Sequence, residues 1–351
     1  MRRYLKRAVL DGAEAEIFNL VSYGATPEQW ADWLRAPLEH AAACGNLDLV
    51  NRLLEAGANG RAGWKGCRGR TLLNAAALGG NPDVVSVLLR AGCRPDVNVV
   101  SASSGRSALQ VAVACGHDAV AKMLIVVGAN TAVRDYRGLS ALEMAAAVGD
   151  VSTMTVLLEH GVDVNAIDSF GSTALHHAAR CGGVAAIDIL LDAGANVDAK
   201  TSTGTTPLHC VGRVQNLLTL LRRGAKINGP DHSGRTALHA ICNREMVQGA
   251  AACVDLLLRR GASETVVDED GYTPADCLET SARNGLCSPY ELGRVRVLLA
   301  RAPADRAWRR RFWVVMLRSR AEKERTSHYG VVSALVGLEL EDAFRKVVAF
   351  L

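Results

Sequence analysis

Three histidines are the side chains whose type and spacing best suit acid–base or metal chemistry. His176, His209 and His239 each follow a leucine, at steps of 33 and 30 residues. An imidazole with a pKa of about 6.5 could transfer protons or bind a metal ion. Their recurrence in Leu-His pairs instead favours a repeated structural role, in which each ring bonds to the backbone of a neighbouring unit. We therefore assign no catalytic residues and expect no cofactor.

The cysteines form a second candidate set for metal binding. Cys44, Cys115 and Cys181 each precede a glycine at the same place in a recurring pattern. Zinc needs sulfur atoms about 2.3 Å from one ion, whereas packed helices lie about 8–10 Å apart. Thiols from separate units therefore should not converge on a metal, and we expect them to be half-buried and reduced. Core packing is expected for three others, Cys210, Cys242 and Cys253.

No motif for nucleotide binding or hydrolysis is present. The sequence lacks a Walker-type loop, HExxH, GxSxG and the kinase residue set. The glycine-rich run from Gly60 to Gly69 has neither a preceding strand nor a helix start at the right offset, so it reads as a loop. The sequence therefore predicts a protein that is not an enzyme.

Composition favours closely stacked short helices. The chain has 351 residues, of which 49% are apolar and 5% aromatic, with 33 glycines. This apolar content is enough for a substantial core, and the abundance of small residues suits helix stacking better than a sandwich or barrel. The first residues lack an apolar run long enough for a signal peptide or membrane span. We therefore expect a cytoplasmic or nuclear location.

Glycine pairs twelve residues apart recur along the chain at steps of 33 to 36 residues. The pairs are Gly12 and Gly24, Gly45 and Gly57, Gly80 and Gly92, Gly116 and Gly128, Gly149 and Gly161, and Gly182 and Gly194. In the regular units a leucine lies seven residues before the first glycine, and an apolar couple lies just before the second. This period indicates a repeat of two short helices, each closed by a glycine.

The repeat resembles that of ankyrin proteins. Thr206–His209 reads Thr-Pro-Leu-His, which matches the opening of an ankyrin unit, and Thr173–His176 and Thr236–His239 are close variants. The link segments Gly161–Ala166 and Gly194–Ala199 match as well. The resemblance covers about residues 1–302 in eight or nine units, some degenerate. It implies an all-α solenoid of helix-turn-helix units with β-turn fingers.

Local residue types agree with this architecture. Threonine before the first helix can accept a backbone hydrogen bond, and Pro207 suits a first helical turn, so a helix should begin there. Alanine pairs such as Ala178-Ala179 let adjacent helices lie close. An aspartate three residues before a glycine suits a tight turn at each finger tip, as at Asp168. The same spacing occurs at Asp135, Asp231 and Asp268.

Two adjacent units depart from the regular length. Leu208 and Gly224 are 16 residues apart, against 19 for Leu175 and Gly194 in a regular unit. The following unit is longer, with an insertion predicted around Gln248 to Ala251. We expect a local bend or a protruding helix corner at that point.

The resemblance places partner contacts at the finger tips and on the concave face of the first helices. The corresponding residues are Arg68, Arg70, Arg106, Tyr136, Arg137, Phe170, Arg180, His232, Arg235, Arg244 and Tyr272. The glycine-rich loop adds Trp64 and Lys65, because a tryptophan among cations in an exposed loop suits an interface. Because this set is basic and aromatic, it favours a protein partner with an acidic or mixed-charge segment. A charged face that is merely solvated is the alternative, as is a Trp64 ring folded onto its neighbours. We expect a monomeric scaffold or adaptor.

Two link asparagines resemble the residue that a hydroxylase modifies in some ankyrin proteins. Asn165 and Asn228 lie in Asp163-Val164-Asn165 and Lys226-Ile227-Asn228. A purely structural role in the turn is the alternative interpretation.

The C-terminal extension, residues 303–351, is basic. Residues 301–325 hold nine lysines and arginines against three acidic residues, although the whole chain has a net charge of only +4. We expect an amphipathic helix from about 304 to 320 that caps the array. Its candidate contact residues are Arg306, Trp308, Arg309, Arg310, Arg311, Phe312 and Trp313.

Other roles for this extension stay open. A basic helix can bind an anionic membrane surface or nucleic acid, although the slightly acidic remainder of the chain disfavours nucleic acid. The extension could also recruit a ubiquitin ligase, as in some ankyrin adaptors, but no F-box or SOCS-box sequence is recognisable.

Overall fold

The computed structural model describes residues 34–58, 70–243, 249–283 and 290–305. The chain forms two compact units, Met1–Leu292 and Gly293–Leu351. Of the second unit, only 293–305 is described, and it is helical. The predicted contact residues Trp64, Lys65, Arg68 and Arg244 and the tail residues from Arg306 onward lie outside the described residues. The predicted domain boundary after residue 302 stays a prediction.

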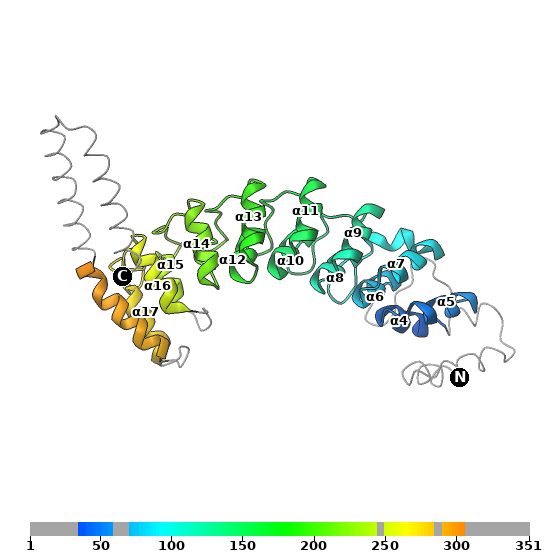
Figure 1. The fold of residues 1–351 in the computed structure, drawn as a ribbon, viewed down its shortest axis with the longest axis horizontal. Helices are drawn as coiled ribbons and strands as arrows, with labels where there is room; N and C mark the ends of the chain where they lie inside the picture. Colours follow the sequence, from blue (N-terminus) through cyan, green and yellow to red (C-terminus); the bar gives the residue numbers. More distant parts are fainter. Residues whose placement is uncertain (1–33, 59–69, 244–248, 284–289, 306–351) are drawn as a thin grey trace, which may run out of the picture. The chain divides into compact units, whose positions relative to one another are not determined.

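The first unit consists of successive pairs of short helices, which form two rows in Figure 1. The first helices are α4 (Arg35–Ala43), α6 (Leu72–Gly79), α8 (Ala108–Ala114), α10 (Ala141–Val148), α12 (Ala174–Arg180), α15 (Ala237–Cys242) and α17 (Pro274–Arg283). The second helices are α5 (Leu47–Glu55), α7 (Pro82–Leu88), α9 (Asp118–Val127), α11 (Val151–Glu159), α13 (Val184–Asp192), α14 (Val214–Arg222) and α16 (Ala250–Arg259). Two short helical turns follow α7, namely η2 (Leu89–Cys93) and η3 (Arg94–Asn98). The predicted all-α solenoid is confirmed.

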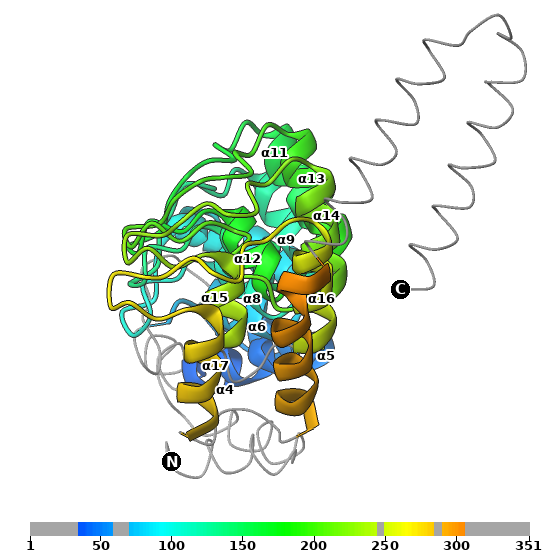
Figure 2. The same ribbon diagram turned by 90° about the vertical axis from the view of Figure 1, so that its left-hand side faces the viewer.

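The loops between units project together on one side. In Figure 2 these finger loops lie beside the first helices and away from the second helices. A serine or threonine precedes most first helices and caps them, as at Thr71, whose hydroxyl accepts a hydrogen bond from the Asn74 amide at 3.1 Å. Each finger therefore ends where a capped helix begins.

The core is built from the recurring leucines and alanines. Leu73, Leu109 and Leu175 are fully buried. The predicted close approach of the first helices is confirmed, because Ala178 and Ala179 are also fully buried. At Gly79 a side chain has no room, since a Cβ there would lie 2.4 Å from the Ala42 carbonyl oxygen.

Most helix-ending glycines have the left-handed backbone that their position predicts. Gly80 after α6 has φ +73° and Gly149 after α10 has φ +82°. Gly182 is different, because its φ does not lie in the left-handed region. A Cβ at Gly182 would meet the Ala146 carbonyl oxygen at 2.6 Å, so this glycine is required by space.

The helix predicted to begin at Pro207 does not form. Residues 207–210 make a turn, and the next helix is α14. Because this unit is three residues short, the chain passes directly against the end of α12. The Gly212 amide donates to the Ala179 carbonyl at 3.2 Å, and a Cβ on Gly212 would lie 2.2 Å from the Arg180 carbonyl oxygen.

A buried asparagine side chain from the shortened unit donates hydrogen bonds to the carbonyls at the end of α12. The Asn216 Nδ2 group donates towards the carbonyls of Ala178, Ala179 and Gly182 at 3.4, 3.0 and 3.3 Å. Asn216 is 1% exposed, so these carbonyls at the end of α12 are satisfied by a side chain of the next unit.

The insertion in the following unit starts outside the described residues. Residues 244–248 belong to that part, whereas Gly249, with φ +74°, immediately precedes α16. Ala250 and Ala251 are therefore the first turn of a regular second helix.

Asn216→Leu should destabilise the array, because a side chain of similar size would remove the side-chain donor from the carbonyls of Ala178 and Gly182 at the end of α12. We expect a loss of about 1–3 kcal/mol in unfolding free energy, measured by urea denaturation followed by circular dichroism. Gln215→Leu, one residue earlier and exposed, is the control. Equal midpoints for both variants would contradict the capping role.

Candidate binding face of the finger loops

The described fingers are tight hairpins built around one polar corner side chain, which is buried in most of them. Asp168 is 7% exposed, and its Oδ1 accepts hydrogen bonds from the amides of Phe170 and Ser172, both at 2.8 Å. The Asp168 amide donates to the Ser172 carbonyl at 2.9 Å, which closes the hairpin. The turn predicted from the Asp-to-Gly spacing is thus confirmed. Asp135 and Asp231 make the same bonds, and the Thr201 hydroxyl replaces the carboxylate in one finger.

Neighbouring fingers are joined by a regular series of backbone hydrogen bonds. The residue after the corner aspartate or threonine donates to the carbonyl just before the turn glycine of the preceding finger. The pairs are Tyr136 to Ser104, Ser169 to Arg137, Ser202 to Phe170, His232 to Thr203 and Glu269 to Ser233, at 2.9–3.4 Å. The turn glycines leave room for this contact, because a Cβ on Gly171 would lie 2.7 Å from the Ser202 amide nitrogen.

Two of the predicted contact arginines link one finger to the next. Arg106 Nε lies 3.2 Å from Asp135 Oδ2, and Arg235 Nε lies 3.0 Å from Asp268 Oδ2. Their side chains keep 32% and 36% exposure, while the two carboxylates are buried. These arginines are therefore bound within the array, a role that the sequence-based assignment did not include.

One position of the first helix also joins adjacent units. The residue after the repeat leucine bonds to the carbonyl that follows the turn glycine of the next finger. His176, His209 and His239 do so through Nε2, with distances of 3.1, 2.9 and 3.2 Å to the carbonyls of Thr205, Arg235 and Tyr272. Their Nδ1 atoms accept from the amides of Thr173, Thr206 and Thr236. The structural role predicted for the histidines is confirmed.

Other units fill this position with an amide. Asn74 Nδ2 donates to the Arg106 carbonyl at 2.9 Å, and Gln110 Nε2 donates to the Leu139 carbonyl at 2.8 Å. Glu143 is the exception, because a carboxylate offers no donor. Burial raises the pKa of Glu143, although hydrogen bonds from Ser140 and the charge of Arg134 oppose this effect.

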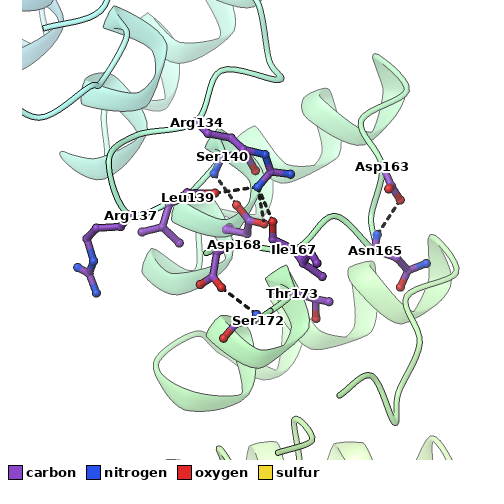
Figure 3. A network of polar contacts seen from close by, with 12 residues as sticks. Arg134, Arg137, Leu139, Ser140, Asp163, Asn165, Ile167, Asp168, Ser172 and Thr173 are labelled. Atoms are coloured by element: carbon purple, nitrogen blue, oxygen red, sulfur yellow. Dashed lines mark hydrogen bonds and ion pairs between the residues drawn. The ribbon is translucent and has the colours of Figure 1, made fainter. Parts of the chain in front are cut away.

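Arg134 partly replaces the link between fingers that Glu143 cannot provide as a donor. Its Nη1 group donates to the carbonyls of Gly138 and Ile167 at 2.7 and 2.6 Å, so it spans two fingers (Figure 3). The same group lies 3.8 Å from Glu143 Oε1, too far for a hydrogen bond. Glu143 Oε1 consequently has no hydrogen-bond partner.

A polar cluster joins one finger to the end of α12. His177 Nε2 lies 3.1 Å from Asp168 Oδ2, and its Nδ1 lies 2.9 Å from Arg180 Nη2. Because Arg180 can only donate, the neutral ring with its proton on Nε2 satisfies both contacts. Burial lowers the pKa of His177, and the charges of Arg180 and Arg137 also lower it, whereas Asp168 opposes them.

The predicted aromatic tip residues present large exposed surfaces. Tyr136, Phe170 and Tyr272 are 69%, 59% and 48% exposed. The Tyr136 hydroxyl donates to the Ala102 carbonyl at 2.9 Å, which fixes its ring against the preceding finger. His232 is exposed and Arg70 is half-buried. Phe170 and Arg137 occupy equivalent places in adjacent fingers, and in Figure 3 the Arg137 side chain points away from the polar network.

The expectation of half-buried thiols before the first glycines is wrong. Cys44, Cys115 and Cys181 are exposed, because each residue follows the last turn of a first helix, where the chain turns outward. Cys242 and Cys253 are buried as predicted, and Cys210 is intermediate. Within the described residues, no group of three His, Cys, Asp or Glu side chains is placed to hold a metal ion.

The link asparagines bond across units. Asn165 Oδ1 accepts from the Asn196 amide at 2.9 Å, and its Nδ2 donates to the Gly194 carbonyl at 3.2 Å. Asn228 repeats this arrangement with Ser263 and Gly261. Both amide side chains thus have structural partners, and hydroxylation of either residue stays a prediction.

Comparison with known families agrees with this geometry. A family model described as "Ankyrin repeats (3 copies)" matches residues 38–135 and 142–231, more than half of the chain, and a single "Ankyrin repeat" model matches 233–269. The chain belongs to the ankyrin-repeat family. Ankyrin repeats generally mediate protein–protein interaction, and ankyrin-repeat proteins are typically scaffolds without enzymatic activity. No curated protein gives a significant match to this ankyrin-repeat chain.

The helices of the described array are too short or too polar to cross a membrane.

Sequence reasoning missed His177 as part of this face. The neighbouring units have Met144 and Cys210 at the same place, two residues after the repeat leucine. The signal that could have identified His177 is that a histidine stands where these units carry less polar side chains. The contact with Asp168 depends on how the finger folds back onto α12, which no sequence spacing specifies.

Acidification should weaken the array through His176. Burial lowers its pKa from 6.5 to about 4, so between these values the unfolded chain takes up a proton that the folded chain excludes. Stability is therefore lost as pH falls from 6.5 towards 4, by up to about 3 kcal/mol. In His176→Gln, which introduces the residue that Gln110 provides in an earlier unit, urea midpoints between pH 7 and 4.5 should vary less. An unchanged slope would contradict this assignment.

Glu143→Gln should stabilise the array by about 1 kcal/mol at pH 7, because glutamine can donate to the Ser172 carbonyl as Gln110 does to Leu139. The raised pKa of Glu143 means that its folded carboxyl keeps a proton longer than the unfolded one, so stability falls as pH rises through the folded pKa. In Glu143→Gln this part of the pH dependence of stability should disappear. Urea unfolding at pH 5 and 8 tests both points, with exposed Glu159→Gln as the control.

Proposed function

We propose that this chain is a protein-binding scaffold or adaptor whose partner lies along the finger tips and the exposed ends of the first helices. The observation that carries this proposal is the exposure of two rings on neighbouring fingers, Tyr136 and Phe170, together with the exposed Arg137 that follows Tyr136 in the chain. Aromatic and arginine side chains supply most of the binding energy in protein interfaces.

Rigidity of the fingers supports this choice of surface. The Phe170 amide is bound to Asp168 and its carbonyl accepts from Ser202 at 3.0 Å. The ring is thus presented on a backbone whose polar groups are already paired, so little conformational entropy is lost when a partner binds.

The partner segment is proposed to carry acidic or mixed charge. Arg137 and Arg180 are exposed on this face, and electrostatic complementarity would favour carboxylates opposite them. Arg106 and Arg235 contribute less to such a segment, because their guanidinium groups already face buried aspartates.

Loss of the two tip rings should remove partner binding while the fold is retained. We expect the double change Tyr136→Ala and Phe170→Ala to lower capture of specific partners from cell extract about tenfold or more, since each buried aromatic anchor contributes about 1–2 kcal/mol or more. Quantitative mass spectrometry of proteins retained by the immobilised full chain measures the effect.

Val126→Ala is the matched control for this experiment, because Val126 is 78% exposed on the second helix α9. It should leave the retained proteins unchanged. A reversed result, with loss for Val126→Ala and none for the double change, would move the binding surface to the second helices.

A further inference from the structure

Two exposed arginines lie on this face without an acidic partner. Within the described part of the chain, neither Arg137 nor Arg180 forms an ion pair, although Arg106, Arg223 and Arg235 all do. Both are exposed. Arg106, Arg223 and Arg235 are thus engaged by aspartates of the array, whereas Arg137 and Arg180 remain available to an external anion.

The positions of these arginines are not required by the scaffold. The residue equivalent to Arg180 in earlier first helices is Ala43, Leu78, Ala114 or Ala147. The residue equivalent to Arg137 in the next fingers is Phe170, Thr203, Ser233 or Asp270. Since these other units fold without a basic residue there, the two arginines are free to serve binding.

Hydrogen bonds link the finger that carries Arg137 to the helix that carries Arg180. Arg137 belongs to the finger before α12, and its carbonyl accepts from the Ser169 amide at 3.4 Å. Ser169 adjoins Asp168, which holds His177, and His177 in turn accepts a hydrogen bond from Arg180. The charges of both arginines act on the His177 ring and lower its pKa together with burial.

The Asp168–His177–Arg180 chain fixes the direction of Arg180. One N–H group of this guanidinium is bound to the imidazole, and a guanidinium has five in all. The remaining donors suit a carboxylate, which arginine binds through two parallel hydrogen bonds. Asp168 is 7% exposed and already accepts two amides and the imidazole, so it is not placed to neutralise the arginines.

We propose that Arg137 and Arg180 together bind a carboxylate side chain in an extended segment of the partner protein, with an adjacent apolar side chain packed on Phe170. This proposal rests on the proposed function of the finger face. The exposed Phe170, which takes the place of Arg137 in the next finger, favours a protein segment over nucleic acid, which requires a longer run of cations along phosphates.

Peptide selection tests this assignment with a defined probe. Random twelve-residue peptides displayed on phage are selected against the full chain and against the double variant Arg137→Gln and Arg180→Gln. We expect sequences from the wild type to be enriched in Asp or Glu next to an apolar residue, and this enrichment to vanish on the double variant. Arg222→Gln, which removes an exposed charge from α14, should leave the enrichment unchanged.

A selected peptide then allows the contact to be measured directly. Replacing its acidic residue by the amide should weaken binding to the wild type about tenfold or more, and should have little effect on binding to the double variant. Equal acidic enrichment on both chains, or equal weakening on both, would overturn the two-arginine site.

A third selection separates this proposal from the proposed function. If peptides are still selected through Tyr136 and Phe170 but show no acidic preference, the arginine site is wrong and the finger face stands. If Tyr136→Ala with Phe170→Ala leaves the selection unaltered, or the wild type selects no peptide, the finger face itself is wrong and the arginine site falls with it.

Discussion

The hydrogen-bonded polar side chain at the corner of a finger, buried in most of those described, is the constraint on which the binding face depends. Asp168 lies almost out of solvent, a position that would be costly for an unpaired carboxylate. Two backbone amides and the His177 ring offset this cost. The same contacts fix the hairpin and attach it to α12, so the direction of Phe170 and Arg180 follows from one side chain.

Contacts between neighbouring units explain how such a face extends along the array. In a solenoid each unit is stabilised mainly by its neighbours, and here one helical position supplies a donor to the next finger in unit after unit. Because that position needs a donor and not a particular residue, Asn74, Gln110 and His176 all fill it. Glu143 does not, and Arg134 bridges the two fingers there. The donor that Glu143 lacks is thus replaced within the same two units, and more distant units keep their regular contacts.

The sequence predicted the helices well because glycine and leucine spacing encodes where each helix ends and which side is buried. It failed at Pro207, where a matching motif was overridden by the three residues missing after it. It did not predict the ion pair between Arg106 and Asp135, because this contact spans 29 residues and depends on the register between fingers. His177 was missed for the same reason, because its contact arises only when the finger packs against the helix.

The separation between scaffold and tip positions explains how a repeat protein can change partners without refolding. At a finger tip the backbone amide and carbonyl are already bonded within the array, as they are at Phe170. The side chain at that place therefore contributes little to the hairpin itself, and adjacent fingers carry Arg137, Phe170 and Thr203 at equivalent places. A partner encounters only these side chains, so recognition is determined by the residues in which the units differ.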